Sequence, residues 1–251
     1  MTVSPSKGLV TIDPATGAGS AQLTVSAAAG TPHGFYTVRF SFITAAGEKL
    51  AERDLLVSVA PPGSLRSMYD NVGISDDNGT HDEANYDGGG FSYSKQALAA
   101  AGLAPGAEVT IAGLTFTWPD SPRGMPDNVR AAGQTLDLSW VPPSATKLSF
   151  VGSSTGGNRA ATAPLTYTDG TTETIDLSFS DWTLGGGSGS VQFDNFVVAQ
   201  TPYRNRNGTD SDTVKTYVFA TSPFTIPTGK KVKSVTLPVN TGIHIFSVAT
   251  G

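Results

Sequence analysis

Tyr36-Thr37-Val38-Arg39-Phe40-Ser41-Phe42 alternates apolar and polar side chains with a period of two. Successive side chains of a β-strand point to opposite faces, so this stretch predicts a strand with one buried and one exposed face. Ala45-Ala46-Gly47-Glu48 follows it and leads, as a hairpin loop, into a second predicted strand at residues 49–59. Two shorter strands are expected earlier, at residues 9–12 and 22–26. The first 60 residues therefore predict half of a β-sandwich.

The remainder of the chain continues the pattern of short strands and turns. Asp169-Gly170 is a hairpin signal, and it predicts residues 161–168 and 171–180 as partners. One short helix is expected at residues 94–102, where Ser94 can cap its start and Gly102 its end. The other strands are expected at residues 66–72, 108–118, 135–140, 147–152, 190–198, 213–220, 231–237 and 243–249. With no helical crossovers, these strands predict an antiparallel jelly-roll sandwich.

Ala60-Pro61-Pro62-Gly63-Ser64 separates the two halves. Two successive prolines end strand pairing, and the glycine and serine after them permit a change of direction. We therefore expect an all-β chain with one small domain at residues 1–60, a linker at 61–64 and a jelly-roll domain at 65–251.

Composition excludes several classes of function. The net charge is −5 and only 15% of the residues are charged, so no basic surface is available for nucleic acid. No apolar run approaches the roughly 20 residues that cross a bilayer, so a membrane partner is not expected. The chain has no cysteine, which excludes thiol catalysis, disulfides and cysteine-bound zinc. The low charge and the abundance of Thr and Gly are typical of secreted bacterial domains, and we expect an extracellular location.

Candidates for catalysis are few. The three histidines, His33, His81 and His244, lie far apart in the sequence, and no Gly-x-Ser-x-Gly motif is present. Paired carboxylates for glycoside hydrolysis would need two acids to meet in a cleft, whereas most acids here lie in turns, where Asp is expected for backbone reasons. A non-catalytic chain is therefore expected.

Residues 75–90 form the most polar segment of the chain. Oxygen ligands at this density suit Ca²⁺, which takes six to eight of them from a flexible loop. The candidate ligands of a structural calcium are Asp76, Asp77, Asp82 and Asp87. A solvated loop with Asx-turns explains the same residues equally well, because no EF-hand pattern is present, and His81 is expected to be a bystander.

A carbohydrate site needs flat aromatic faces beside groups that hydrogen-bond hydroxyls. Tyr203 is the strongest aromatic candidate, because it stands next to Arg204 and Asn205, while Tyr86 and Trp182 are further candidates. Trp182 follows an apolar run and is also explained as a core residue. Arg204 is equally explained by an ion pair with Asp181 or Asp194.

Two resemblances add to these expectations. The segment from Val3-Ser4-Pro5 to Gly34-Phe35-Tyr36 resembles an Ig-like module of the NEW type found in secreted bacterial glycosidases. This resemblance implies an Ig-like domain at residues 1–60, which is expected to be incomplete because the strand that usually precedes the Ser-Pro is absent. Residues 64–251 resemble a C-terminal β-sandwich of secreted actinobacterial glycosidases, especially family 92 α-mannosidases. The second resemblance is carried by Asn85-Tyr86-Asp87-Gly88-Gly89-Gly90-Phe91-Ser92-Tyr93-Ser94, Leu114-Thr115-Phe116-Thr117-Trp118-Pro119, Tyr167-Thr168-Asp169-Gly170-Thr171, Ser178-Phe179-Ser180-Asp181-Trp182 and Pro202-Tyr203-Arg204-Asn205.

The resemblance implies an accessory module of a glycoside hydrolase that binds carbohydrate, with the catalytic domain of the parent enzyme as its other partner. A second interpretation is a rigid brace that packs on the catalytic domain without binding sugar. Exposed aromatic residues on a concave face favour binding, whereas buried ones favour the brace. An autonomous glycoside hydrolase is the third and least supported interpretation.

Overall fold

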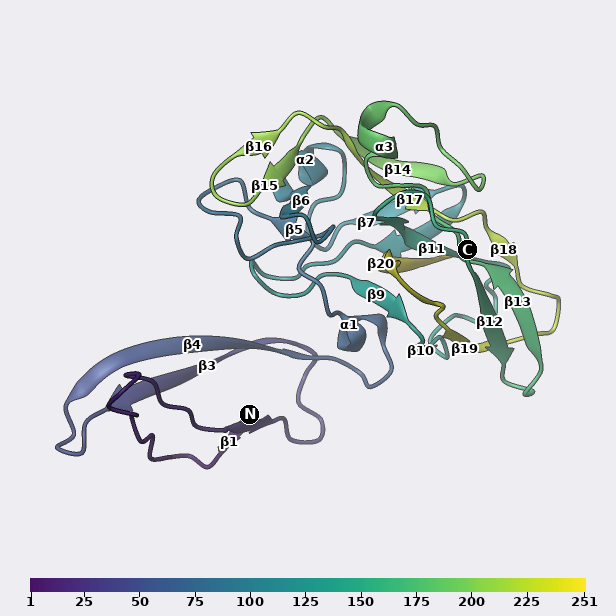
Figure 1. The fold of residues 1–251 in the computed structure, drawn as a ribbon. Coiled ribbons are helices and arrows are strands. Elements are labelled where there is room, and N and C mark those ends of the chain that lie inside the picture. The colour runs from purple at the N-terminus through teal and green to yellow at the C-terminus, as the bar shows by residue number, and fades with distance from the viewer. The chain divides into compact units, whose positions relative to one another are not determined.

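The structure is a computed structural model that describes residues 1–251. The chain divides into two compact units, Met1–Pro61 and Pro62–Gly251. Strands are the main secondary structure of both units and helices are few, so the predicted all-β fold class is confirmed (Figure 1). None of the helices has both the length and the apolar character needed to span a bilayer.

The N-terminal unit contains two antiparallel strand pairs. β1 (Thr2–Ser4) pairs with β2 (Thr24–Ser26), and β3 (Gly34–Ile43) pairs with β4 (Lys49–Val59) along the predicted hairpin. Residues 9–12, predicted as a strand, are irregular. Their apolar side chains find little to pack against, and Leu9 is 92% exposed.

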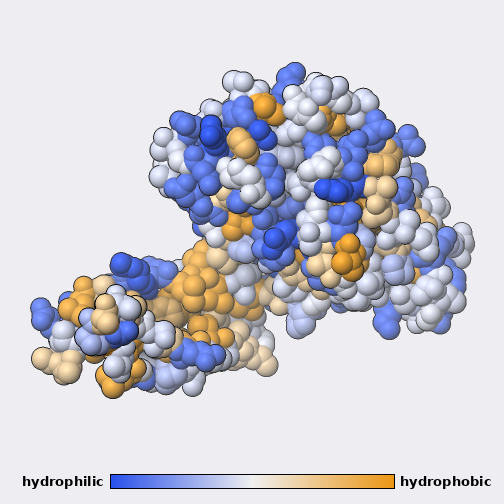
Figure 2. Space-filling view, viewed as in Figure 1, coloured by the Kyte–Doolittle hydropathy of each residue, from blue (hydrophilic) through white to orange (hydrophobic).

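Few side chains of this unit are buried. Val38 is its only buried hydrophobic residue, while Phe42, Ile43, Leu50 and Leu55 remain exposed. Figure 2 shows hydrophobic residues at the surface of this unit. A single two-stranded hairpin is marginally stable in water, because it buries too little apolar area to offset the loss of chain entropy. The sandwich of residues 1–61 is therefore a partial one.

The C-terminal unit contains three sheets. The eight-stranded sheet has the order β14-β17-β11-β20-β8-β7, with β18 beside β11 and β9 beside β20. Its strands are β7 (Glu108–Ile111), β8 (Leu114–Thr117), β9 (Val129–Ala132), β11 (Lys147–Ser154), β14 (Phe196–Thr201), β17 (Thr216–Ala220), β18 (Phe224–Thr225) and β20 (Val239–Thr250). A four-stranded sheet has the order β10-β19-β12-β13 and contains β10 (Thr135–Asp137), β12 (Thr162–Tyr167), β13 (Thr172–Asp176) and β19 (Val232–Thr236).

The third sheet is small and has the order β16-β15-β6-β5. It contains β5 (Ile74–Ser75), β6 (Phe91–Ser94), β15 (Arg204–Arg206) and β16 (Ser211–Asp212). β5 and β6 are parallel, while the other pairs are antiparallel. This sheet brings residues 74–94 beside residues 204–212, more than a hundred positions later in the chain.

Two hydrophobic cores lie on opposite faces of the eight-stranded sheet. The first core packs Leu148 and Phe150 of β11 against Leu165 of β12 and Val235 of β19. The second core packs Phe246 of β20 against aromatic residues from the other side, including Tyr86, Tyr93 and Trp118. β20 is consequently buried on both faces, and seven of its residues from Ile243 to Ala249 are buried.

The pairing of β11 with β20 depends on a glycine. The register shifts by a bulge between Val151 and Gly152. A Cβ atom at Gly152 would overlap the carbonyl oxygen of His244. Only glycine lets the two central strands approach this closely.

Three short helices complete the domain: α1 (Leu65–Met68), α2 (Lys95–Ala100) and α3 (Leu184–Gly187). The helix prediction is confirmed, because Ser94 accepts a hydrogen bond from the Ala97 N–H and Gly102 adopts a left-handed conformation with φ of 93°. The strand predicted at residues 66–72 is wrong. Ser64 accepts a hydrogen bond from the Ser67 N–H there and so starts a helix instead.

Candidate functional site

The four carboxylates predicted to bind calcium lie in one loop region and have protein partners. Asp76 accepts hydrogen bonds from the backbone and side-chain nitrogens of Asn78 and from Gln96. These bonds, the backbone one foremost, lower the pKa of Asp76 to about 2. Asp82 accepts from the Gly208 N–H, and Asp87 accepts from the Gly89 and Phe91 N–H groups.

Asp77 connects this loop to the predicted aromatic site. Its Oδ2 atom lies 2.6 Å from the hydroxyl of Tyr203, and its Oδ1 atom lies 2.8 Å from Nδ2 of Asn205. No group of three or more His, Asp or Glu side chains is arranged to hold a metal ion. The region therefore has the geometry of a loop held by its own hydrogen bonds, and calcium remains a prediction.

Arg204 lies between an aromatic ring and two carboxylates. Its guanidinium carbon is 3.6 Å from the centroid of the Phe91 ring. One guanidinium nitrogen is 2.9 Å from Asp212, and another is 3.8 Å from Asp87. Asp181 and Asp194, the partners considered from the sequence, are not the ones it pairs with. These contacts fix β15 against β6.

The other predicted sugar ligands are mostly buried. Tyr86 is 1% exposed and Trp182 is 2% exposed, and their ring centroids lie 5.0 Å apart inside the second core. Asn205 is also buried and donates to Ser75 and Asp77. None of these three residues has a face open to solvent or lines the pocket beside α2, so none can stack on or hydrogen-bond a sugar in this conformation. Tyr203 is half-buried.

We expect Tyr203→Phe to lower the free energy of unfolding by about 1 kcal/mol, since it removes the hydroxyl that donates to Asp77. The measurement is urea denaturation of the full chain. Tyr217→Phe is the matched control, because Tyr217 is also half-buried and its side chain donates no hydrogen bond to the protein. Equal midpoints for the two variants would contradict this structural role.

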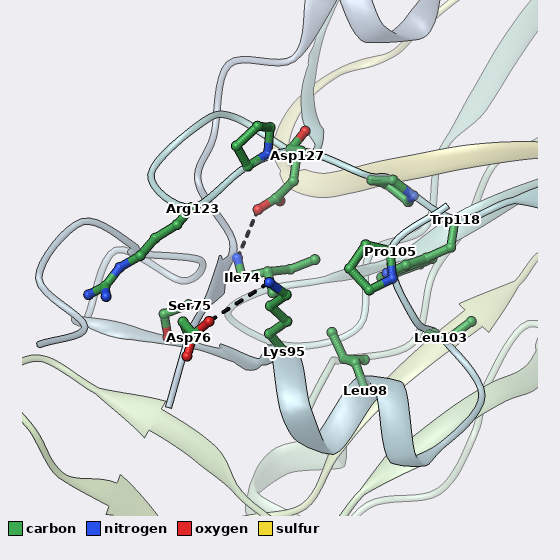
Figure 3. A pocket seen from close by; sticks show the side chains of 13 residues that line it. Ile74, Ser75, Asp76, Lys95, Leu98, Leu103, Pro105, Trp118, Arg123 and Asp127 are labelled. Carbon is green, nitrogen blue, oxygen red and sulfur yellow. Dashed lines mark hydrogen bonds and ion pairs between the residues drawn. The ribbon is translucent and has the colours of Figure 1, made fainter. Parts of the chain in front are cut away.

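A pocket opens beside this network, between β5, α2 and the loop that follows β8 (Figure 3). Its lining atoms surround about 440 Å³ of space, a volume that includes open solvent. Its apolar wall consists of Ile74, Leu98, Leu103, Pro105, Trp118, Pro119 and Pro122. Its polar lining consists of Ser75, Asp76, Lys95, Ser121, Arg123 and Asp127.

Asp127 is the most unusual of these polar residues. It is 3% exposed, and its carboxylate accepts hydrogen bonds from the Gly73 and Ile74 N–H groups and from Nδ2 of Asn128. Burial disfavours the ionised form and raises the pKa of Asp127 to about 7, although the hydrogen bonds oppose this shift. From the sequence, Asp127 resembles an ordinary turn residue after Pro126, and no spacing distinguishes it.

A polar chain extends from Asp127 into the domain. Asn128 donates to Asp127 over 2.7 Å, and its Oδ1 atom lies 2.8 Å from Nδ1 of His244. Since Oδ1 is an acceptor, His244 must donate through Nδ1–H. Burial lowers the pKa of His244 to about 3, so its ring is neutral at pH 7. Neither residue is recognisable as a pair from the sequence, because 116 positions separate Asn128 from His244.

Comparison with known proteins agrees with this architecture. A family model for the AziU2-like β-sandwich domain matches residues 62–251. The chain belongs to the AziU2-like β-sandwich domain family. No curated protein matches the chain. The pocket, the Asp77–Tyr203 network and both hydrophobic cores all lie within the AziU2-like domain.

Trp140 places an exposed aromatic side chain on the surface of the AziU2-like domain. It is 53% exposed, in contrast to the buried Trp118 and Trp182. Its Nε1–H donates to the carbonyl of Asp137 in the turn after β10. This bond holds an indole ring at the surface, but Trp140 is not among the residues that line the pocket.

Proposed function

We propose that the chain is a non-catalytic accessory module of a secreted glycoside hydrolase and that its AziU2-like domain binds carbohydrate. The observation that carries the proposal is the pocket beside α2, which combines an apolar wall with several hydrogen-bonding groups. The resemblance of residues 64–251 to C-terminal sandwiches of secreted glycosidases supports the same function. The binding residues proposed here are those of the pocket, because Tyr86, Trp182 and Asn205 are buried.

A sugar ring matches such a lining. Its C–H face is apolar and packs on prolines, while its hydroxyls bond carboxylates and hydroxyls. Pro105 and Pro122 supply the first kind of surface, and Asp76 and Ser121 supply the second. We propose that the pocket takes a single sugar unit, such as the end of a glycan chain.

Binding of one sugar unit gives a weak interaction, and an accessory module can use it. A module tethered to a catalytic domain raises the local concentration of that domain on a polymer. We propose that this targeting occurs outside the cell, on a polysaccharide or on glycoprotein glycans.

The brace is the second candidate, and the burial of the aromatic residues favours it. Tyr86, Tyr93, Trp118 and Trp182 are all buried, and Arg204 is held by Phe91 and Asp212. A rigid spacer between domains needs a well-packed interior and no ligand. The two candidates differ in whether purified protein retains any glycan.

The test is a glycan array together with pull-downs on insoluble polysaccharides, each run with calcium and with a chelator. Pro105→Trp places a large side chain at the rim of the pocket, and Pro143→Trp makes the same change at an exposed proline outside it. We expect the wild type and Pro143→Trp to bind the same glycans and Pro105→Trp to lose at least tenfold in affinity, about 1.4 kcal/mol.

Two outcomes would overturn the pocket as the site. Loss of binding in Trp140→Ala with Pro105→Trp unaffected would move the site to the exposed indole. Absence of binding to every glycan would favour the brace.

A further inference from the structure

Asp127 is the only charged residue of the pocket lining that has no ion-pair partner. Lys95 pairs with Asp76 at 3.8 Å, and Arg123 pairs with Glu83 at 2.6 Å. Asp127 is the fourth charged residue of the lining, and no Lys, Arg or His nitrogen lies within 4 Å of its carboxylate. When Asp127 is ionised, its carboxylate therefore has no counter-ion in direct contact.

The surroundings of Asp127 contain only neutral groups in direct contact. Its hydrogen-bond partners are two backbone N–H groups and the Asn128 amide, at distances of 2.7 to 3.2 Å. Tyr69 and Tyr86 lie close enough for Asp127 to raise the pKa of each phenol, although burial is the larger cause for both. His244 is separated from Asp127 by Asn128 and is uncharged at pH 7.

A buried carboxylate without a counter-ion is costly, and a cation that enters its pocket recovers that cost. The pocket that Asp127 lines also has an apolar wall, which includes Leu98, Leu103 and Trp118 and lowers the local dielectric (Figure 3). A ligand ammonium would therefore interact with Asp127 more strongly than with an exposed acid.

We propose that the pocket selects a sugar that carries a free, protonated amine, and that this ammonium group binds Asp127. This inference rests on the proposed carbohydrate function and specifies its ligand. An N-acetylated sugar has no positive charge to offer, and a neutral sugar leaves Asp127 uncompensated. Free amino sugars, alone or at the end of a glycan chain, are the ligand class that fits.

The inference also predicts how binding depends on pH. Asp127 must lose its proton to pair with the ammonium, and its pKa near 7 means that about half of the carboxylate is ionised at pH 7. At about pH 5.5 only a few per cent is ionised, while an amine with a pKa near 8 stays protonated. Affinity for the amino sugar should therefore fall on the order of tenfold between these pH values, and protons should be released on binding at pH 6.

The experiment is isothermal titration calorimetry of the full chain with glucosamine, N-acetylglucosamine and glucose. We expect glucosamine to bind at least tenfold more tightly than the other two at pH 7. Asp127→Asn should remove this preference and the pH dependence, while Asp210→Asn, the same change at an exposed acid, should keep both.

Lys95→Ala provides a test that does not depend on how Asp127→Asn folds. It removes a cation from the pocket wall, where Lys95 is held only by a 3.8 Å ion pair. We expect glucosamine affinity to rise about two- to fivefold, because repulsion of the ammonium is removed. Lys215→Ala, at an exposed lysine outside the pocket, should have no effect.

The outcomes separate the two proposals. Equal binding of glucosamine and glucose, or lower glucosamine affinity in Lys95→Ala, would overturn the amino-sugar inference while leaving carbohydrate binding intact. Failure of all three sugars to bind at millimolar concentrations, together with an empty glycan array, would overturn the proposed function itself.

Discussion

Replacing Phe246 by alanine is expected to lower the free energy of unfolding of the C-terminal domain by about 3–5 kcal/mol. Phe246 is fully buried in β20, the strand between β11 and β8, and its ring centroid lies 4.8 Å from that of Trp118 and 5.8 Å from those of Tyr86 and Tyr93. Truncation leaves a cavity that these rigid rings cannot close. Chemical denaturation followed by tryptophan fluorescence measures the loss.

Phe196→Ala is the matched control for this variant. Phe196 lies in β14, the edge strand of the same sheet, and it is exposed. Its truncation removes a phenyl ring without opening a cavity, so we expect a change below about 1 kcal/mol. A loss in Phe246→Ala no larger than that of the control would show that the second core is loosely packed.

The second large effect concerns Asp127 and His244, two buried residues that are connected through the side chain of Asn128. The folded-state pKa of Asp127 is about 7, above the 3.8 of a free Asp, so its contribution to stability grows as the pH falls from 7 toward 4. The folded-state pKa of His244 is about 3, below the usual 6.5, so its contribution is lost as the pH falls from 6.5 toward 3. Between about pH 6.5 and 4 the two contributions oppose each other and nearly cancel.

Replacing either residue should reveal how the other makes the free energy of unfolding depend on pH. In Asp127→Asn the free energy of unfolding should fall by about 1.4 kcal/mol per pH unit below 6.5, as His244 resists protonation. In His244→Gln it should rise by a similar amount per unit as the pH falls from 7, because Asp127 gains its proton in the folded state. Arg130 lies near His244 and adds to the lowering of its pKa, so it belongs to the same electrostatic group.

The measurement is urea denaturation at several pH values from 7 to 4.5. This range avoids acids with a lowered pKa, such as Asp76, whose loss of stability comes at lower pH. Parallel pH profiles for the two variants would disprove the opposing contributions of Asp127 and His244. Opposite slopes around a flat wild-type profile would establish them.

The elements that could be predicted from the sequence were those that depend on residues close together in the chain. The hairpins at Gly47 and Gly170 and the capped helix at Ser94 each depend on a few adjacent residues, and all three are confirmed. The prediction of a strand at residues 66–72 was wrong because it followed the apolar residues and overlooked Ser64, which caps a helix there. β5, β15 and β16 were missed since strands of two or three residues carry no periodicity.

The candidate site was less predictable for a related reason. Asp77, Tyr203 and Asn205 were all singled out, but nothing in the sequence indicated that they form one network. The hydrogen bonds that join Asp77 to Tyr203 and Asn205 span 126 and 128 positions of the chain. The burial of Tyr86 could not be predicted from the sequence either. Its glycine-rich surroundings are typical of an exposed loop, and only the packing of Phe246 and Trp182 around it encloses the ring. Asp127 gained its properties entirely from tertiary burial.

The position of β20 has a consequence for how the domain is made. This strand occupies the middle of the eight-stranded sheet and supplies side chains to both cores, yet residues 239–250 are the last of the domain to leave the ribosome (Figure 1). Until they emerge, β11 lacks its main neighbour and the apolar faces of the other strands stay open. Closure of the sandwich must therefore follow translation of the whole domain, and the partly made domain exposes apolar surface until then.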